Sequence, residues 1–150
     1  MNVSICSRRE IEKLLTEDFP QNIAVISFVD SMLEDSDEED YAPVDYSGKA
    51  KRYFQIAIQD IHYDELEEYG MNYRDYFPEA DGLAEFVIQS EEDGFDIICQ
   101  CEYGQSRSAG CAAAILEFFY HNGISIFADY KYCPNQMVFH KVYDALRMSH

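Results

Sequence analysis

Several features are scarce or missing in this chain of 150 residues: it has no tryptophan, only 11 basic side chains against 29 acidic ones, and no long apolar run. A segment that crosses a bilayer needs about 20 consecutive apolar residues, and no such segment is present. No apolar segment with a basic flank opens the chain, which argues against a secretory signal. The net charge of −18 repels nucleic acid, polyphosphates and anionic membranes. We therefore expect a cytoplasmic protein that binds neither nucleic acid nor membranes.

The pattern of the five cysteines predicts neither a disulfide framework nor a metal site. Their number is odd and their spacing irregular, as is usual in a reducing cytosol. Cys99 and Cys101 are two positions apart, which is not a Cys-x-x-Cys pair, and no histidine pair is placed to complete a tetrahedral site. We expect Cys6, Cys99, Cys111 and Cys133 to fill core or near-surface positions. We expect no metal and no organic cofactor.

Nearly half of the residues are apolar, and 12 tyrosines and 10 phenylalanines provide large side chains for a core. A chain of this length fits one domain over residues 1–150. Apolar runs predict strands, and apolar residues at helical spacing predict helices. The strands are predicted at Val3–Cys6, Ile23–Val29, Phe54–Ile58 and Ile97–Cys99, and the helices after a Ser7 cap, at Leu83–Glu92, at Ser108–Tyr120 and at Gln136–Arg147.

This alternation of strands and helices predicts an α/β fold, with a central, mostly parallel sheet flanked by helices on both faces. Open sheets of this kind bind ligands at the carboxyl ends of their strands. Two segments interrupt the alternation. Residues 34–40 include six acidic side chains and are interpreted as a solvated loop, because they lack the spacing of a calcium-binding loop. The aromatic side chains of residues 65–81 are interpreted as packing a loop onto the body, the alternative being a wall beside the active site.

One stretch has the features of a phosphate-binding loop, and it runs Cys101-Glu102-Tyr103-Gly104-Gln105-Ser106-Arg107-Ser108. A predicted strand precedes it and a predicted helix follows it, so its N–H groups lie at a helix N-terminus, where an anion is favoured. Gly104 lets the loop curl without a Cβ penalty. The same field favours the nucleophilic thiolate of Cys101, and the planar Arg107 guanidinium can bind two phosphate oxygens at once. The alternative is a buried structural cysteine followed by a solvated arginine.

The stretch resembles the signature loop of the cysteine-dependent protein tyrosine phosphatases, in the form Cys-Glu-x-Gly-x-Ser-Arg-Ser-Ala-Gly that is familiar in small dual-specificity phosphatases. Residues 2–8 are similar to the opening strand of compact bacterial and phage relatives, and residues 134–139 to the start of their closing helix. Gln100 stands where the family usually has a histidine. The resemblance implies the family's α/β fold and its phosphatase activity.

The resemblance also implies a general acid on an upstream loop, usually an aspartate just after a strand. Asp60 directly follows the segment of residues 53–59, which contains one predicted strand, and Asp64 is a rival four residues further on. The chemistry needs such a group because an alkoxide or phenoxide leaves phosphorus slowly without a proton. Aspartates after strands are also common turn residues, so we prefer Asp60 and keep Asp64 as the alternative. His62, between them, is interpreted as a surface residue.

The predicted reaction has two steps. The Cys101 thiolate attacks phosphorus in line and forms a phospho-cysteine, while Asp60 protonates the leaving oxygen and later activates a water. The resemblance implies that Ser108 hydrogen-bonds the Cys101 sulfur. The groups expected to bind the non-bridging phosphate oxygens are the loop residues Glu102, Tyr103, Gly104, Gln105, Ser106 and Arg107.

The variable positions of this loop contain no lysine or arginine, whereas relatives that act on multiply phosphorylated inositides tend to carry basic residues there. The resemblance therefore implies a substrate with a single phosphate, first of all phosphotyrosine in a protein, with tolerance for phosphoserine and phosphothreonine. A small phosphomonoester is the second choice, and a phosphate- or phosphoprotein-binding module without turnover is the hypothesis from another class. The missing tryptophan excludes the tryptophan-led acid loop of the longer tyrosine-specific enzymes.

Overall fold

A parallel sheet of four strands forms the centre of the computed structural model, which describes residues 1–30 and 42–149. The strands are β1 (Val3–Cys6), β2 (Ile23–Val29), β3 (Arg52–Ala57) and β4 (Asp96–Gln100). Their order is β1-β4-β2-β3, and every neighbouring pair is parallel. The predicted α/β fold is therefore confirmed. The acidic run at residues 34–40 lies outside the described residues.

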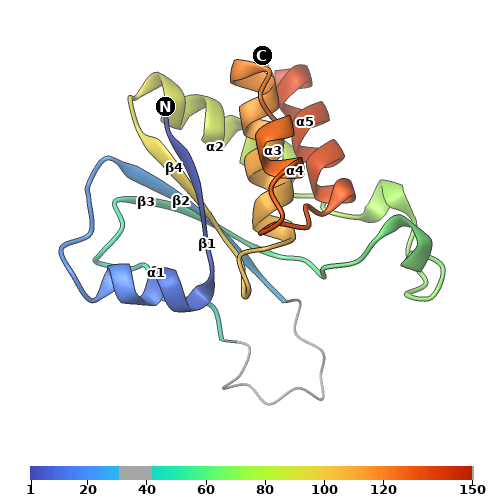
Figure 1. Cartoon of the computed structure of the whole chain (residues 1–150), viewed down its shortest axis with the longest axis horizontal. Helices are drawn as coiled ribbons and strands as arrows, with labels where there is room; N and C mark the ends of the chain where they lie inside the picture. Colours follow the sequence, from blue (N-terminus) through green and yellow to red (C-terminus); the bar gives the residue numbers. More distant parts are fainter. Residues whose placement is uncertain (31–41, 150) are drawn as a thin grey trace.

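Helices cover both faces of the sheet unequally (Figure 1). One face carries α1 (Arg8–Leu15), and the other carries α2 (Ala80–Glu92), α3 (Arg107–Tyr120) and α5 (Gln136–Ser149). A short helix, α4 (Ile124–Phe127), and two 3-10 turns, η1 (Tyr63–Glu65) and η2 (Tyr73–Asp75), were not predicted from the sequence. None of the helices in the described ranges is long and apolar enough to cross a bilayer.

The strand β2 shows why these elements pack as they do. Its alternate residues Ile26 and Phe28 face the larger core beneath α2, α3 and α5, whereas Val25 faces a smaller core beneath α1. Because β2 is buried on both faces, its sequence is a continuous apolar run rather than an alternating one. In the loop after β3, Tyr76 and Phe77 are buried in the larger core, which confirms that these two aromatic residues pack the loop onto the body.

The Ser7 cap predicted at the start of α1 is present, and Glu10 completes it to a capping box. The Ser7 hydroxyl accepts a hydrogen bond from the Glu10 N–H, and the Glu10 carboxylate accepts one from the Ser7 N–H. The largest difference between predicted and observed helix starts concerns α2, which begins at Ala80 rather than at Leu83. The spacing of apolar residues could not reveal this first turn, because Ala80 is followed by Asp81 and Gly82, which are not apolar core residues.

Candidate active site

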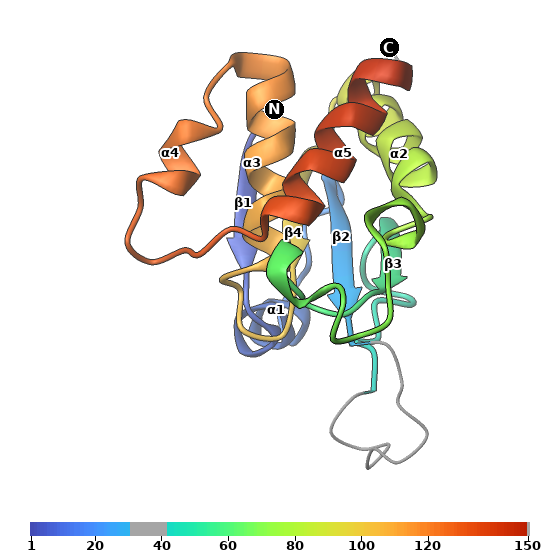
Figure 2. The ribbon, with the colours of Figure 1, turned by 90° about the vertical axis from the view of Figure 1, so that its right-hand side faces the viewer.

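The phosphate loop, residues 101–107, connects the carboxyl end of β4 to the first turn of α3. In Figure 2 the strand arrows point the same way, toward the end of the sheet where this loop and α1 lie. The strand, loop and helix follow one another in the predicted order. The loop therefore sits at the carboxyl edge of the sheet, where parallel α/β folds bind ligands.

Gly104 holds the loop against the turn between β1 and α1. Its φ is +67°, and a Cβ at this position would lie 2.6 Å from the Ser7 nitrogen and 2.9 Å from the Cys6 carbonyl carbon. The Arg8 N–H donates a 3.0 Å hydrogen bond to the Glu102 carbonyl in the same contact. Glycine is needed here both for the backbone conformation and for the close approach.

The N–H groups of the phosphate loop after Cys101 have no partner within the described ranges. None of the N–H groups of residues 102–107 donates a hydrogen bond to another described residue. Ser106 occupies the N-cap position of α3, but its hydroxyl does not cap the helix. The first turn of α3 therefore keeps its donors free for an anion, and the helix dipole favours one there.

Cys101 lies at the base of the loop, almost completely buried. Its sulfur is 3.0 Å from the Ser108 hydroxyl oxygen, the contact that the family resemblance implied. Two other cysteines lie nearby: burial raises the pKa of Cys6 to about 11, and a hydrogen bond with Cys111 together with burial raises the pKa of Cys99. Cys6 and Cys99 therefore stay protonated at neutral pH.

Arg107 is buried, and its guanidinium is held from one side only. Its Nη1 donates to the Ile58 carbonyl at 2.8 Å and lies 2.9 Å from the Asp30 carboxylate. Its Nε is buried without a hydrogen-bond partner, and Nη2 makes no hydrogen bond to the described residues. A buried donor without a partner is rare in native structures. Nε and Nη2 form one edge of the planar fork, the edge that binds two oxygens of an anion.

Asp60 lies against the phosphate loop. Its Oδ1 accepts a 2.7 Å hydrogen bond from the Ser106 hydroxyl and a 2.8 Å hydrogen bond from the side-chain amide of Asn135. Asp60 is exposed, so a substrate in the loop can reach its carboxylate. The structure thus brings Asp60 together with Cys101, Arg107 and Ser108 in one site.

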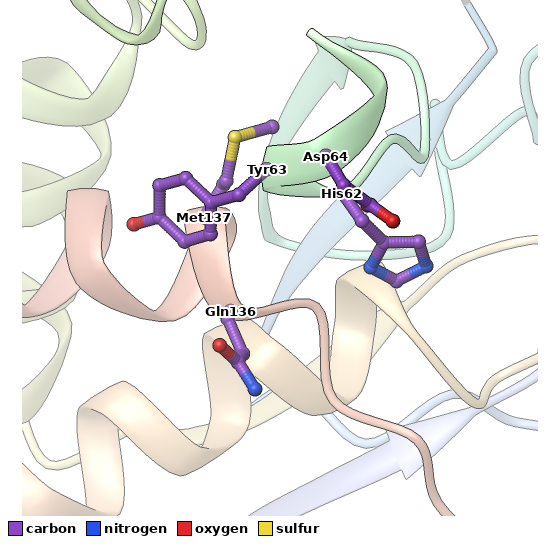
Figure 3. A pocket seen from close by; sticks show the side chains of 5 residues that line it. All are labelled: His62, Tyr63, Asp64, Gln136 and Met137. Carbon is purple, nitrogen blue, oxygen red and sulfur yellow. The ribbon is translucent and has the colours of Figure 1, made fainter.

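Asp64 lies elsewhere. It lines a pocket of about 280 Å³ with His62, Tyr63, Gln136 and Met137 (Figure 3). In this pocket the start of α5 faces residues 62–64. Within the described residues no hydrogen bond links Asp64 to the phosphate loop. His62 is exposed, as interpreted from the sequence.

Gln100, the residue before Cys101, is buried under the loop on the α1 side of the sheet. Its side-chain oxygen accepts hydrogen bonds from the hydroxyls of Ser27 and Tyr46. Burial raises the pKa of Tyr46 well above its ordinary value, so this hydroxyl remains a donor. A neutral hydrogen-bonded side chain thus stands where the phosphatases that the sequence resembles usually have a histidine.

Sequence reasoning missed two residues of the site, Asp30 and Asn135. Asp30 directly follows β2, Asp60 lies a few residues after the end of β3, and the Asp30 carboxylate pairs with Arg107. The rule that ligands bind at the carboxyl ends of strands could have identified it. Asn135 precedes α5 and accepts a hydrogen bond from the Val138 N–H, as an N-cap residue does. The sequence gives no signal for its contact with Asp60.

No protein-family model matches the sequence, and no curated protein matches it. Solved structures do match the fold. Human tyrosine phosphatase-like serine/threonine/tyrosine-interacting protein has a TM-score of 0.57 at 15% identity, with 95% of this chain and 86% of that chain covered. Human DUSP28 has a TM-score of 0.55 at 12% identity, with 98% and 92% covered. PTPMT1 in complex with PI(5)P has a TM-score of 0.55 at 11% identity, with 98% and 91% covered.

These similarities extend over almost the whole chain, and at such low identity they define the fold alone. The chain has the compact α/β fold of the dual-specificity and tyrosine phosphatase structures, as the sequence resemblance implied. The four parallel strands and their helical layers correspond to this fold. The chemistry of the site depends on its own residues, because one fold can carry many functions.

Proposed function

We propose that this protein is a phosphomonoester hydrolase that works through a phospho-cysteine at Cys101. One observation carries the proposal: the loop that follows the buried Cys101 thiol keeps unused donors. They are the loop N–H groups and the free Nε of the buried Arg107. Donors left without partners are costly unless a ligand uses them. A phosphoryl group carries three non-bridging oxygens, which match a loop of N–H groups and a planar fork.

The proposed reaction begins when the Cys101 thiolate attacks phosphorus, which forms the S–P bond and breaks the bond to the leaving oxygen. Asp60 donates its proton to this oxygen, and the loop amides with Arg107 stabilise the equatorial charge. A water deprotonated by Asp60 then attacks phosphorus and releases phosphate. Ser108, 3.0 Å from the sulfur, stabilises the thiolate that departs in this second step.

For the substrate we propose phosphotyrosine in a protein, with phosphoserine and phosphothreonine as slower substrates. The phosphate loop forms one phosphate-binding site. Its variable residues Glu102, Tyr103 and Gln105 carry no positive charge that could bind a second phosphate. The net charge of −18 disfavours polyanionic substrates. PI(5)P, which PTPMT1 binds in its structure, is the lipid to compare. We place the protein in the cytoplasm.

The test is release of para-nitrophenol from para-nitrophenyl phosphate, and of phosphate from a phosphotyrosine peptide, a phosphoserine peptide and PI(5)P. We expect release that vanadate inhibits. Cys101→Ser should abolish turnover and still bind the phosphotyrosine peptide, because the donors of the cradle remain. Cys133→Ser, at the exposed cysteine near the loop, is the matched control and should keep wild-type activity.

Absence of release between about pH 5 and 8, the range in which phosphate monoesters and thiols titrate, would refute the proposal. If the phosphotyrosine peptide still bound, the protein would be a binding module. Residual turnover of Cys101→Ser near the wild-type rate would refute the assignment of the nucleophile.

A further inference from the structure

We infer that Asn135 is a positioning residue that holds Asp60 for proton transfer, an inference that rests on the function proposed above. Asn135 lies directly before α5, far from Asp60 in the sequence, and its side chain is completely buried. It joins three parts of the site: the segment of Asp60, the phosphate loop and the start of α5.

The side-chain amide of Asn135 donates two hydrogen bonds and accepts one. Its Nδ2 donates to the Asp60 carboxylate at 2.8 Å and to the Ile61 carbonyl at 2.9 Å, and its Oδ1 accepts from the Val138 N–H at 3.0 Å. Only an amide of this length offers two donors and an acceptor in one plane. Serine or aspartate could still cap α5 but could not hold both Asp60 and Ile61.

The geometry at Asp60 assigns different roles to its two oxygens. Ser106 and Asn135 both donate to Oδ1, and within the described ranges no hydrogen bond reaches Oδ2. Oδ2 is therefore the oxygen free to carry the proton and to face the leaving group. Because Ser106 belongs to the phosphate loop, the two donors fix the carboxyl group relative to the place where phosphorus binds.

The backbone supports the same arrangement. The Asn135 N–H donates to the Ser106 carbonyl at 3.0 Å. On α3, a Cβ at Gly110 would collide with the Asn135 carbonyl oxygen. Gly110 is thus required for the segment before α5 to lie against the first turn of α3.

Removing the two Asn135 donors should lower the rate, because the Asp60 carboxyl group is no longer held beside the leaving oxygen. The loss should be large only where the leaving oxygen needs a proton, because Asp60 acts at that step alone. A purely structural role would produce no such dependence on the leaving group.

The experiment uses Asn135→Ser, which keeps a cap for α5, with Gln136→Ser as the matched control at the next, exposed position. Turnover is measured with an alkyl phosphate, a poor leaving group, and with an activated aryl phosphate. We expect the turnover rate of Asn135→Ser to fall about ten- to a hundredfold on the alkyl phosphate and much less on the aryl phosphate. In the Asp60→Asn background the same substitution should cause no further loss, since the acid it positions is already absent.

Crystal structures of the wild type and of Asn135→Ser separate this inference from the proposed function, because they need no turnover. An Asp60 carboxyl group that has moved away from Ser106 in the variant supports the inference. If Asn135→Ser does not fold, Asn135→Asp, which also keeps a cap for α5, takes its place. An Asp60 side chain that keeps its place, equal losses on both substrates, or a further loss in the Asp60→Asn background would overturn the inference. A wild-type protein without turnover whose variant still shows the displaced carboxyl group would refute the proposed function and leave the role of Asn135 in place.

Discussion

Replacing Arg107 by lysine tests the phosphate cradle most directly, because the exchange keeps the charge and removes only the fork. The guanidinium Nη1 is already engaged by Ile58 and Asp30, so the phosphate has to be bound by the opposite edge, Nε and Nη2. A lysine ammonium can bind either the pair Ile58 and Asp30 or the phosphate. It cannot present two parallel donors to the phosphate as the guanidinium does.

The structure sets the size of the expected effect. Two charge-assisted hydrogen bonds, each worth about 1.5–3 kcal/mol, are lost from the transition state, and the ammonium recovers part of them as a point charge. A net loss of about 3–4 kcal/mol corresponds to a decrease of about 10²- to 10³-fold in kcat/KM. The affinity for vanadate should fall in the same direction, because vanadate occupies the same donors.

The assay is kcat/KM on para-nitrophenyl phosphate with the vanadate inhibition constant, and thermal unfolding shows whether the variant folds. Arg8→Lys is the matched control. Arg8 lies beside the phosphate loop, and its side chain contacts Glu12, the Ala42 carbonyl and the Glu102 carboxylate. A lysine keeps the charge in this partly exposed group, so we expect a change below about threefold. If Arg107→Lys stays within about tenfold of the wild type with unchanged vanadate inhibition, the fork does not bind phosphate and the reasoning is wrong.

Three further predictions concern other parts of the site. Asp60→Asn should lower the rate by about 10²- to 10⁴-fold on a phosphate ester with a poor leaving group, and much less on an activated aryl phosphate, because only the former needs the proton; equal losses would contradict this role. Gly104→Ala should lose phosphatase activity and about 1–2 kcal/mol of stability, measured by urea denaturation, because φ is +67° and the Cβ would meet Ser7; a fully active variant would show that the loop can move away. Tyr46→Phe should lower the free energy of unfolding by about 1 kcal/mol, because the Gln100 side-chain oxygen loses a buried hydrogen-bond donor. Burial raises the pKa of Tyr46, so the unfolded chain releases this proton first and the wild-type unfolding free energy should decrease as pH rises past about 10. Tyr46→Phe should show a shallower decrease, and an identical slope would contradict this cause.

The sequence alone predicted the features that neighbouring residues decide. The strand, the curled loop with Gly104 and the helix behind it are contiguous, so the placement of Cys101 and Arg107 in one loop follows from local chain geometry. The capping box of Ser7 and Glu10 is local for the same reason. Apolar runs identified all strands of the described sheet, and their alternation with helices predicted parallel pairing.

Contacts between distant segments could be decided only by the tertiary structure. The order β1-β4-β2-β3 brings Asp30 and Asp60, which follow β2 and β3, to the same edge as the phosphate loop. Asp60 and Asn135 are 75 positions apart, and their hydrogen bond exists only because α5 packs beside α3. The choice between Asp60 and Asp64 depends on the same packing: both follow one strand, and only the path of the chain after β3 puts one carboxylate against Ser106 and the other in a separate pocket. Local sequence specifies which groups are available, whereas the distances between them are set by how the strands are ordered and how the helices pack.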